Sequence, residues 1–425
     1  MARRSQVFLP EAGVKKKLQR PPSQPQPTVL RQLVELIPAY LVAKLARKHG
    51  VDEQARTFSP WSHVVALLYA QVTHALSLND VCDSLRAWAT RLRALRGATP
   101  PSRNALSHAN KIRDSALAQD LFWQVLGHLQ DRCPGFGRGS TRGLAWRFRR
   151  AIHVVDTTVI ELVAGCLDWA QHQRRKAAAK CHLRLSLRSL LPELVVVSAA
   201  HEADVARVRQ LCAGLHSGEI VLFDRAYLWL EHCWELTQRG VFFVTRARER
   251  MCWRVVQRRR SRDARVLADE SVVATGRWVR GDYPQPLRRV TARVKVDGQE
   301  RVLTFLTNNF TWSAGSVAEL YRCRWQIEAF FKQIKQTLQL ADFLGHSANA
   351  VQWQVWMALL VYVLLRFQAW CSQWAHSFSR LFTLLRSTLW QRRDLAQLLR
   401  RYGTADGHFA LLAAPAQSWL PGFAR

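Results

Sequence analysis

Two short apolar runs that each end at an aspartate constrain the fold of this 425-residue chain most strongly. Residues 152–155 precede Asp156 and residues 220–223 precede Asp224, and both runs are rich in β-branched side chains. Runs of this length between polar residues predict buried strands, and functional groups of open α/β sheets tend to lie at strand ends. A single aspartate there is more often a turn former or a helix N-cap. Two of them make an α/β fold with a shared site the stronger prediction.

A helical segment near residue 320 carries a third acid, Glu328, among Tyr321, Arg324 and Lys335. At about 100° per residue, the angles from Tyr321 are about −60° for Arg324, −20° for Glu328 and −40° for Lys335. A phenol, two cations and a carboxylate therefore share one face of the helix. A solvated face usually scatters its charges and a core face excludes them. One acid among basic groups suits a site that binds metal and phosphate together.

Three carboxylates on separate elements, without a cysteine or histidine cluster, suit a hard divalent cation held by oxygen. We expect two Mg²⁺ ions, with Mn²⁺ as a substitute, about 4 Å apart, where they activate a water or a 3′-hydroxyl for attack on phosphorus. Asp156 would bridge both ions, while Asp224 would hold one and Glu328 the other. Arg324 and Lys335 would bind phosphates beside the scissile bond. Tyr321 would hydrogen-bond a phosphate oxygen, or else be a partly buried aromatic residue.

The charge of the chain predicts a polyanionic partner. Lysine and arginine outnumber the acids 62 to 31, which gives a formal charge of +31. An anionic membrane is the alternative partner, but no basic amphipathic helix dominates. The longest apolar run, residues 355–365, is too short to span a bilayer and predicts a buried helix. Nine scattered cysteines without a C-x-x-C pair argue against a zinc cluster and indicate a reducing cytoplasm.

Composition and periodicity divide the chain into seven segments. These are a basic, proline-rich leader (1–28), a helical DNA-binding domain (29–131), a glycine-rich linker (132–150), the first part of an α/β core (151–248), a mostly β insertion (249–312), the core helix with Glu328 (313–340) and a helical C-terminal region (341–425). The expected order in the core is β-β-β-α-β-α-β. The insertion is expected to contain a hairpin that turns at Asp297 and Gly298.

Two further segments are candidate DNA contacts. A helix predicted after the break at residues 99–102 carries Arg103 and Lys111, which suit a major groove or, equally well, an ordinary solvated face. Residues 246–265 hold nine arginines and two acids. This stretch is either a solvated loop or an arm, with Arg246 and Trp253, that follows a DNA strand and stacks exposed bases.

These residues resemble the DDE transposases of bacterial insertion sequences that carry a Y-R-E-K signature. The matching residues, with gaps of two, three and six residues, are Tyr321, Arg324, Glu328 and Lys335. Residues 224–227 resemble the family's D-x-(G or A)-(Y or F) motif, residues 156–158 its D-(S or T)-T motif, and residues 102–107 part of its N-terminal domain. None of the acid positions departs from the family pattern.

The resemblance implies a ribonuclease H-like core interrupted by a mostly β insertion, with Asp156, Asp224 and Glu328 as an active triad. It implies cut-and-paste transposition by a homodimer that binds terminal inverted repeats and target DNA, often through hairpin-ended intermediates. In some members a tryptophan of the insertion holds a flipped base, and Trp253 and Trp278 are both candidates here. It also implies a bacterial cytoplasmic protein that associates with the nucleoid when bound to DNA.

Two alternatives to a transposase stay open on the sequence alone. A nuclease of the same fold would cut DNA without joining it, and a non-catalytic descendant would only bind DNA. A descendant that only binds has no physical reason to keep all three acids, and this chain has them. Joining of a precleaved end to target DNA distinguishes a transposase from a nuclease.

Overall fold

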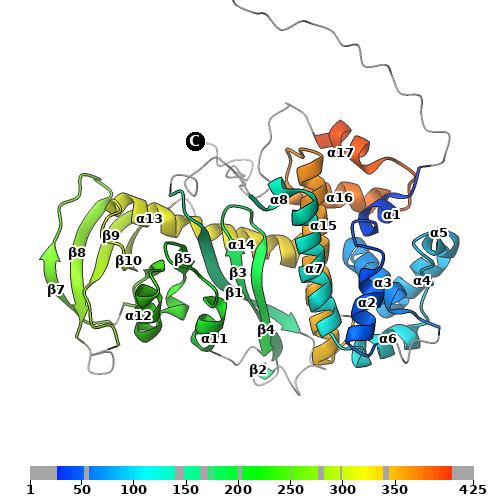
Figure 1. The fold of residues 1–425 in the computed structure, drawn as a ribbon, viewed down its shortest axis with the longest axis horizontal. Helices are drawn as coiled ribbons and strands as arrows, with labels where there is room; N and C mark the ends of the chain where they lie inside the picture. The colour runs from blue at the N-terminus through cyan, green and yellow to red at the C-terminus, as the bar shows by residue number, and fades with distance from the viewer. Residues whose placement is uncertain are drawn as a thin grey trace, which may run out of the picture.

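The computed structural model describes residues 26–51, 57–138, 148–162, 171–173, 176–199, 203–249, 251–275, 282–296, 299–337 and 344–403. In these residues the chain has a mixed α/β fold. One large β-sheet forms most of the elongated molecule, and a helical lobe forms one end of it (Figure 1).

The described strands form a single ten-stranded sheet. They are β1 (Ile152–Leu162), β2 (Gln171–Gln173), β3 (Lys176–Ser186), β4 (Pro192–Ala199), β5 (Ile220–Phe223), β6 (Phe242–Arg246), β7 (Trp253–Arg258), β8 (Val266–Ala274), β9 (Leu287–Val296) and β10 (Gln299–Thr307). Their order is β2-β3-β1-β5-β6-β10-β9-β8-β7, and β4 pairs with β3 outside this path. The pairs β1–β5 and β5–β6 are parallel, and the remaining pairs are antiparallel.

The helices divide between the lobe and the sheet. Those of the lobe are α1 (Val29–Val34), α2 (Leu41–Lys48), α3 (Pro60–Thr73), α4 (Leu78–Ala87), α5 (Ala89–Arg93), α6 (Arg103–Ile112), α7 (Ala116–Arg132), α8 (Pro134–Arg138), α15 (Ala348–Cys371), α16 (Phe378–Thr388) and α17 (Leu395–Gly403). Those that cover the sheet are α11 (Asp204–Leu211), α12 (Leu230–Gln238), α13 (Ala314–Cys323) and α14 (Trp325–Lys332). A 3₁₀ turn spans Arg225–Tyr227, and a π-helix spans Gln333–Thr337.

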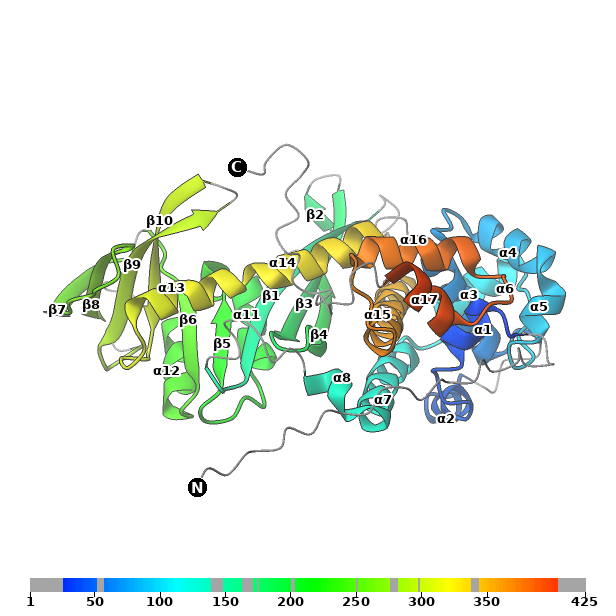
Figure 2. The ribbon, with the colours of Figure 1, turned by 90° about the horizontal axis from the view of Figure 1, so that it is seen from above.

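The parallel strands at the centre of the sheet are covered on both faces. Ile220 and Leu222 of β5 belong to the apolar cluster that contains residues of α13 and α14, whereas Val221 and Phe223 belong to the one that contains α11 and α12. Figure 2 shows α13 and α14 crossing one face of the sheet. Because both faces of β5 are buried, its sequence is continuously apolar and does not alternate.

The β insertion does not form a sheet of its own. Strand β10 pairs with β6, so β7 to β10 extend the core sheet. Arg288 of β9 ties this extension to the start of α13. Its guanidinium binds the carboxylate of Asp269 at 2.8 Å and donates to the carbonyl oxygens of Asn309 and Trp312. Both partners of the ion pair are almost fully buried.

We expect Asp269→Ala to lower the free energy of unfolding by about 3–5 kcal/mol, because the Arg288 guanidinium then stays buried without its counter-charge. Urea denaturation of the full chain measures the change. Glu35→Ala is the matched control, since it breaks an exposed ion pair with Arg31 and should cost at most about 1 kcal/mol. Equal losses in the two variants would contradict this role of the buried pair.

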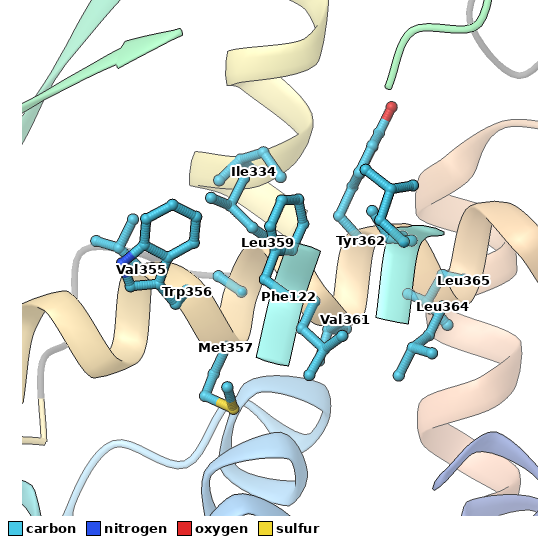
Figure 3. Packing of buried hydrophobic residues seen from close by; sticks show 14 of the residues in the cluster. Phe122, Ile334, Val355, Trp356, Met357, Leu359, Val361, Tyr362, Leu364 and Leu365 are labelled. Carbon is cyan, nitrogen blue, oxygen red and sulfur yellow. The ribbon is translucent and has the colours of Figure 1, made fainter. Parts of the chain in front are cut away.

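The helical lobe is built from two distant parts of the chain. Helix α15 lies at its centre and packs against α3, α6 and α7. Figure 3 shows the contact with α7, where the rings of Phe122 and Trp356 lie 5.5 Å apart between centroids. Among the described residues, α15 alone is long and apolar enough to cross a membrane, and most of it is buried in the protein. The buried helix predicted at residues 355–365 is confirmed.

The predicted order of elements in the core is confirmed. Strands β1, β3 and β4 come first, followed by α11, β5, α12 and β6, and the short β2 is additional. The predicted hairpin of the insertion is also present, because β9 and β10 pair from Arg288 opposite Thr307 to Val296 opposite Gln299. Its expected turn at Asp297 and Gly298 lies outside the described residues.

Three expectations about boundaries were wrong. Strand β1 does not end at Asp156, because its pairing with β3 continues beyond that residue. Residues 134–138 of the expected linker are helical, since Phe136 is buried against Phe367 of α15. Thr28, placed in the leader, is the N-cap of α1 and its hydroxyl accepts a hydrogen bond from a backbone N–H of that helix.

Candidate active site

Asp156 and Asp224 occupy equivalent positions on neighbouring parallel strands. The pairing of β1 with β5 ends where Val155 lies opposite Phe223, and each aspartate is the next residue along the chain. Beyond this point β5 stops and the chain enters the 3₁₀ turn, while β1 continues along β3. The two aspartates therefore lie side by side at the carboxyl ends of the parallel strands, the edge at which open α/β sheets bind ligands.

The junction between α13 and α14 brings the third acid to the same place. Arg324 lies between the two helices and is 7% exposed. Its Nη1 lies 2.5 Å from Oδ2 of Asp156, and its Nη2 donates to Oε1 of Glu328 at 2.7 Å. Tyr321 of α13 donates its hydroxyl hydrogen to Oδ1 of Asp224 at 2.9 Å. Two residues of this helical segment thus contact all three carboxylates, which we call the acid cluster.

Burial is the largest influence on the pKa of Asp156. It raises the pKa of Asp156 to about 6; the Arg324 guanidinium and a backbone N–H oppose this rise, and the carboxylates of Asp224 and Glu328 add to it. Burial also lowers the pKa of Arg324, but the surrounding acids outweigh it and hold that pKa above its usual range. The cluster therefore holds one cation among three acids, and its negative charge is only partly compensated.

A family model described as a transposase DDE domain matches residues 148–364, half of the chain and the part that contains the acid cluster. This chain belongs to the DDE transposase family. Residues 25–95 match a second family, described as a domain of unknown function.

The similar proteins agree with this assignment. A putative transposase of Sinorhizobium fredii, y4zB, is 31% identical over 304 residues, which are 71% of this chain and 81% of that protein. The probable transposase for insertion sequence element IS5377 of Geobacillus stearothermophilus is 28% identical over 249 residues, 58% of this chain and 63% of that one. A solved piggyBac transposase synaptic complex with hairpin DNA covers 91% of this chain and 85% of its own, but with a TM-score of 0.40 and 9% identity it carries no argument. The chain is a DNA transposase of an insertion sequence and depends on a divalent metal.

The donor set of the transposase fits a hard divalent cation, because the acid cluster offers only carboxylate oxygens and carries uncompensated charge. The arrangement of these carboxylates in the structure is only partly suited to holding a cation. In the residues that the structure describes, no three acidic, histidine or cysteine side chains are grouped closely enough to hold an ion. The Arg324 guanidinium lies between Asp156 and Glu328 instead. Metal binding at the acid cluster would therefore require Asp156 and Glu328 to exchange Arg324 for the ion.

Tyr321 and Lys335, the two remaining residues of the signature, lie in different surroundings. Tyr321 is a buried aromatic residue whose ring packs against Phe305 and whose hydroxyl is already bonded to Asp224. Lys335 lies in the π-helix, where the α-helical angle used to place it does not hold. Its charge opposes the burial that raises the pKa of Cys181 on β3 to about 12, so its ammonium lies near that strand.

Sequence reasoning missed the polar residues behind the acid cluster. The Tyr227 hydroxyl lies 3.2 Å from Nδ1 of His182, whose Nε2 lies 3.1 Å from the Ser198 hydroxyl, and both rings are fully buried. Oδ1 of Asp156 accepts a hydrogen bond from the Thr157 N–H at 2.9 Å. Tyr227 stands in the matched D-x-A-Y motif, which is a signal for it. A lone histidine inside a strand gives no such signal.

The other predicted contact residues lie in different parts of the molecule. Arg103 and Lys111 are exposed on α6 in the helical lobe (Figure 2). Arg246 ends β6 directly after Thr245, which pairs with Phe223, so it lies beside Asp224 at the same edge of the sheet. Its guanidinium is 3.8 Å from the carboxylate of Glu249. Trp253 begins β7 and packs, partly buried, against the apolar cluster on the α11 and α12 side of the sheet. Trp278 lies outside the described residues.

Proposed function

We propose that this transposase cuts and joins DNA at the ends of its insertion sequence, with Asp156, Asp224 and Glu328 as the metal-holding acids. The observation that carries this proposal is the contact of Arg324 and Tyr321 with all three carboxylates at one edge of the parallel strands. A binding-only descendant of the fold would need no such convergence of the three acids.

We further propose a ribonuclease H-like core. Its support is the element order, in which three antiparallel strands precede two parallel ones, and a helix with the last acid returns across them. The acids would hold two Mg²⁺ ions, for which Mn²⁺ would substitute. Such ions supply activation of a water or 3′-hydroxyl and stabilisation of the leaving oxygen.

The signature residues prepare the site before DNA arrives. Arg324 compensates part of the charge of Asp156 and Glu328 while the site is empty of substrate, and Tyr321 fixes the orientation of Asp224. A guanidinium binds phosphate with the same pair of donors that it offers to carboxylates. Arg324 can therefore pass from the acids to a DNA phosphate, which frees both carboxylates. Lys335 would bind a neighbouring phosphate as a point charge.

The proposed substrates are the terminal inverted repeats of the element and a target DNA, bound by a homodimer in the cytoplasm of a bacterium, at the nucleoid. Arg103, Lys111 and Arg246 would contribute phosphate contacts. Trp253 is partly buried, so its exchange of protein contacts for a base would need a local opening of β7. Trp278 stays a second candidate for that role.

The test uses the full chain, Mg²⁺ and labelled duplexes that carry the flanking ends of its own gene, with products mapped on a denaturing gel. Cleavage at the element boundary and joining of a precleaved end to target DNA are the expected results. Cleavage without joining would favour a nuclease, and binding without cleavage would favour a non-catalytic descendant.

DNA binding should weaken steeply as salt rises, since the formal charge is +31. We expect the plot of log affinity against log salt concentration to fall by about 0.9 units for each phosphate neutralised, and by several units in total. Fluorescence anisotropy of a labelled duplex in EDTA measures this slope without cleavage. A flat titration would contradict a polyanionic substrate.

A further inference from the structure

A cavity of about 620 Å³ lies in the helical lobe, away from the acid cluster. It opens between α3, the end of α4, α5 and the segment that joins α16 to α17. Four of the residues that line it are arginines, namely Arg91, Arg386, Arg392 and Arg393, and none of its lining residues is acidic in the part of the chain that the structure describes. We call this cavity the basic pocket.

Aromatic rings hold the innermost arginine of the basic pocket in place. The Arg91 guanidinium lies over the Trp88 ring at 4.6 Å, and its Nη1 donates to the carbonyl oxygen of Trp390 at 2.6 Å. The Trp88 and Trp390 rings stack on each other with centroids 5.5 Å apart. A guanidinium has five N–H donors, so most of those of Arg91 stay available for a ligand. Fixing the side chain in advance lowers the entropy cost of binding one.

The segment that carries Arg392 and Arg393 is held by the backbone of α1. The N–H groups of Val29 and Leu30 donate to the carbonyl oxygens of Gln391 and Leu389 at 3.0 and 2.9 Å. The segment between α16 and α17 is therefore pinned across the lobe. Arg392 and Arg393 are exposed on this segment, and no hydrogen bond or ion pair holds either side chain within the described residues.

The chemistry of the basic pocket selects an anionic ligand with several acceptor oxygens. Four guanidinium groups without an acid repel one another, and a neutral ligand would not offset that repulsion. Phosphate suits them because its oxygens match the paired N–H groups of a guanidinium. The substrate of a transposase is DNA, whose backbone carries a phosphate at every nucleotide. The concave, partly exposed form of the basic pocket suits a segment of that backbone.

We propose that the basic pocket binds backbone phosphates of the element's DNA, at a distance from the catalytic acids. This inference rests on DNA as the substrate. It gives a role to the family described as a domain of unknown function, which supplies Trp88 and Arg91, and to the C-terminal helices, which complete the pocket. Phosphate contacts of this kind position a duplex and carry no sequence information.

The test compares two double variants of the full chain. Arg392→Gln with Arg393→Gln removes two charges from the basic pocket, and Lys44→Gln with Arg47→Gln removes two exposed charges from α2, outside it. Anisotropy of a labelled end duplex in EDTA gives the salt slope of each. We expect the slope of the pocket variant to be shallower by about 2 units and that of the control to match the wild type. An unchanged slope in the pocket variant, or an equal fall in both, overturns the proposal.

Two further arms separate the remaining outcomes. The first arm measures binding of inorganic phosphate at constant ionic strength. If the basic pocket is a site for free phosphate only, the pocket variant will lose phosphate binding but keep the salt slope of DNA binding, which would contradict the proposal. Arg386→Gln, expected to lower the slope by about 1 unit, replaces the double variant if thermal melts show that the latter unfolds. Cleavage by the pocket variant should return at low salt and high protein concentration. If the wild type does not cleave DNA but its salt slope still differs from that of the pocket variant, the proposed function is wrong and the role of the basic pocket in DNA binding is retained.

Discussion

Asp156→Asn should abolish DNA cleavage and at the same time make the protein more stable at neutral pH. The amide keeps the shape of the carboxyl but cannot hold a divalent cation with an anionic oxygen. We expect cleavage to fall by at least about three orders of magnitude, or about 4 kcal/mol of transition-state stabilisation. DNA binding in EDTA should stay within about twofold, because one charge on a recessed acid contributes little to binding at the phosphates.

The gain in stability follows from the sign of the pKa shift. The pKa of Asp156 is raised to about 6 in the folded protein, so the folded state favours the neutral carboxyl. The free energy of unfolding therefore falls as pH rises from about 4 through 6, by about 3 kcal/mol in total. The asparagine variant lacks this loss. Its free energy of unfolding should exceed that of the wild type by about 3 kcal/mol at pH 7.5 and equal it near pH 4.

Urea denaturation at both pH values checks this prediction. Asp83→Asn is the control, because Asp83 is exposed on α4 and its replacement should change stability by less than about 0.5 kcal/mol. An asparagine variant less stable than the wild type at pH 7.5 would show that the ionised carboxylate is favoured in the folded state. Surviving cleavage would remove Asp156 from the site.

Arg324→Gln should make folding depend on divalent cations. In EDTA the variant leaves Asp156 and Glu328 without the guanidinium that contacts both, and breaking a buried pair in this way costs about 3 kcal/mol. Mg²⁺ can bind the released carboxylates, so it should raise the melting temperature of the variant more than that of the wild type. Cleavage should be lost even with Mg²⁺, because the phosphate ligand is missing.

Thermal unfolding in EDTA and in Mg²⁺ measures both effects. Arg324→Lys is the informative comparison, since an ammonium keeps the charge but cannot contact two carboxylates through two fixed nitrogens. It should lie between the wild type and the glutamine variant in EDTA. Equal Mg²⁺ shifts in the wild type and Arg324→Gln would contradict competition between the guanidinium and the ion.

The features that local pattern encodes were predictable. The apolar run 220–223 has no polar face because β5 is covered on both sides. This run predicted both the strand and the functional acid that follows it. The spacing of Tyr321, Arg324 and Glu328 placed these residues on one face, and the structure brings that face to the sheet. Short-range periodicity suffices for such inferences.

The features that depend on distant pairing were not predictable. Nothing around Arg324 indicates that the helix is interrupted there, because the interruption accompanies contacts with an acid 168 residues away. The pairing of β6 with β10, which merges the insertion with the core, likewise joins segments about 60 residues apart. The stack of Trp88 on Trp390 joins both ends of the lobe. Sequence spacing carries no information about such partners.

The placement of α15 at the centre of the lobe sets the timing of maturation during translation. The ribosome makes α1 to α8 long before α15, and the intervening stretch takes roughly 10–40 s at typical rates of synthesis. In that interval the faces of α3 and α7 that later cover α15 have no permanent partner. A nascent chain therefore lacks a finished lobe, and the newborn protein becomes competent only after α15 has been synthesised.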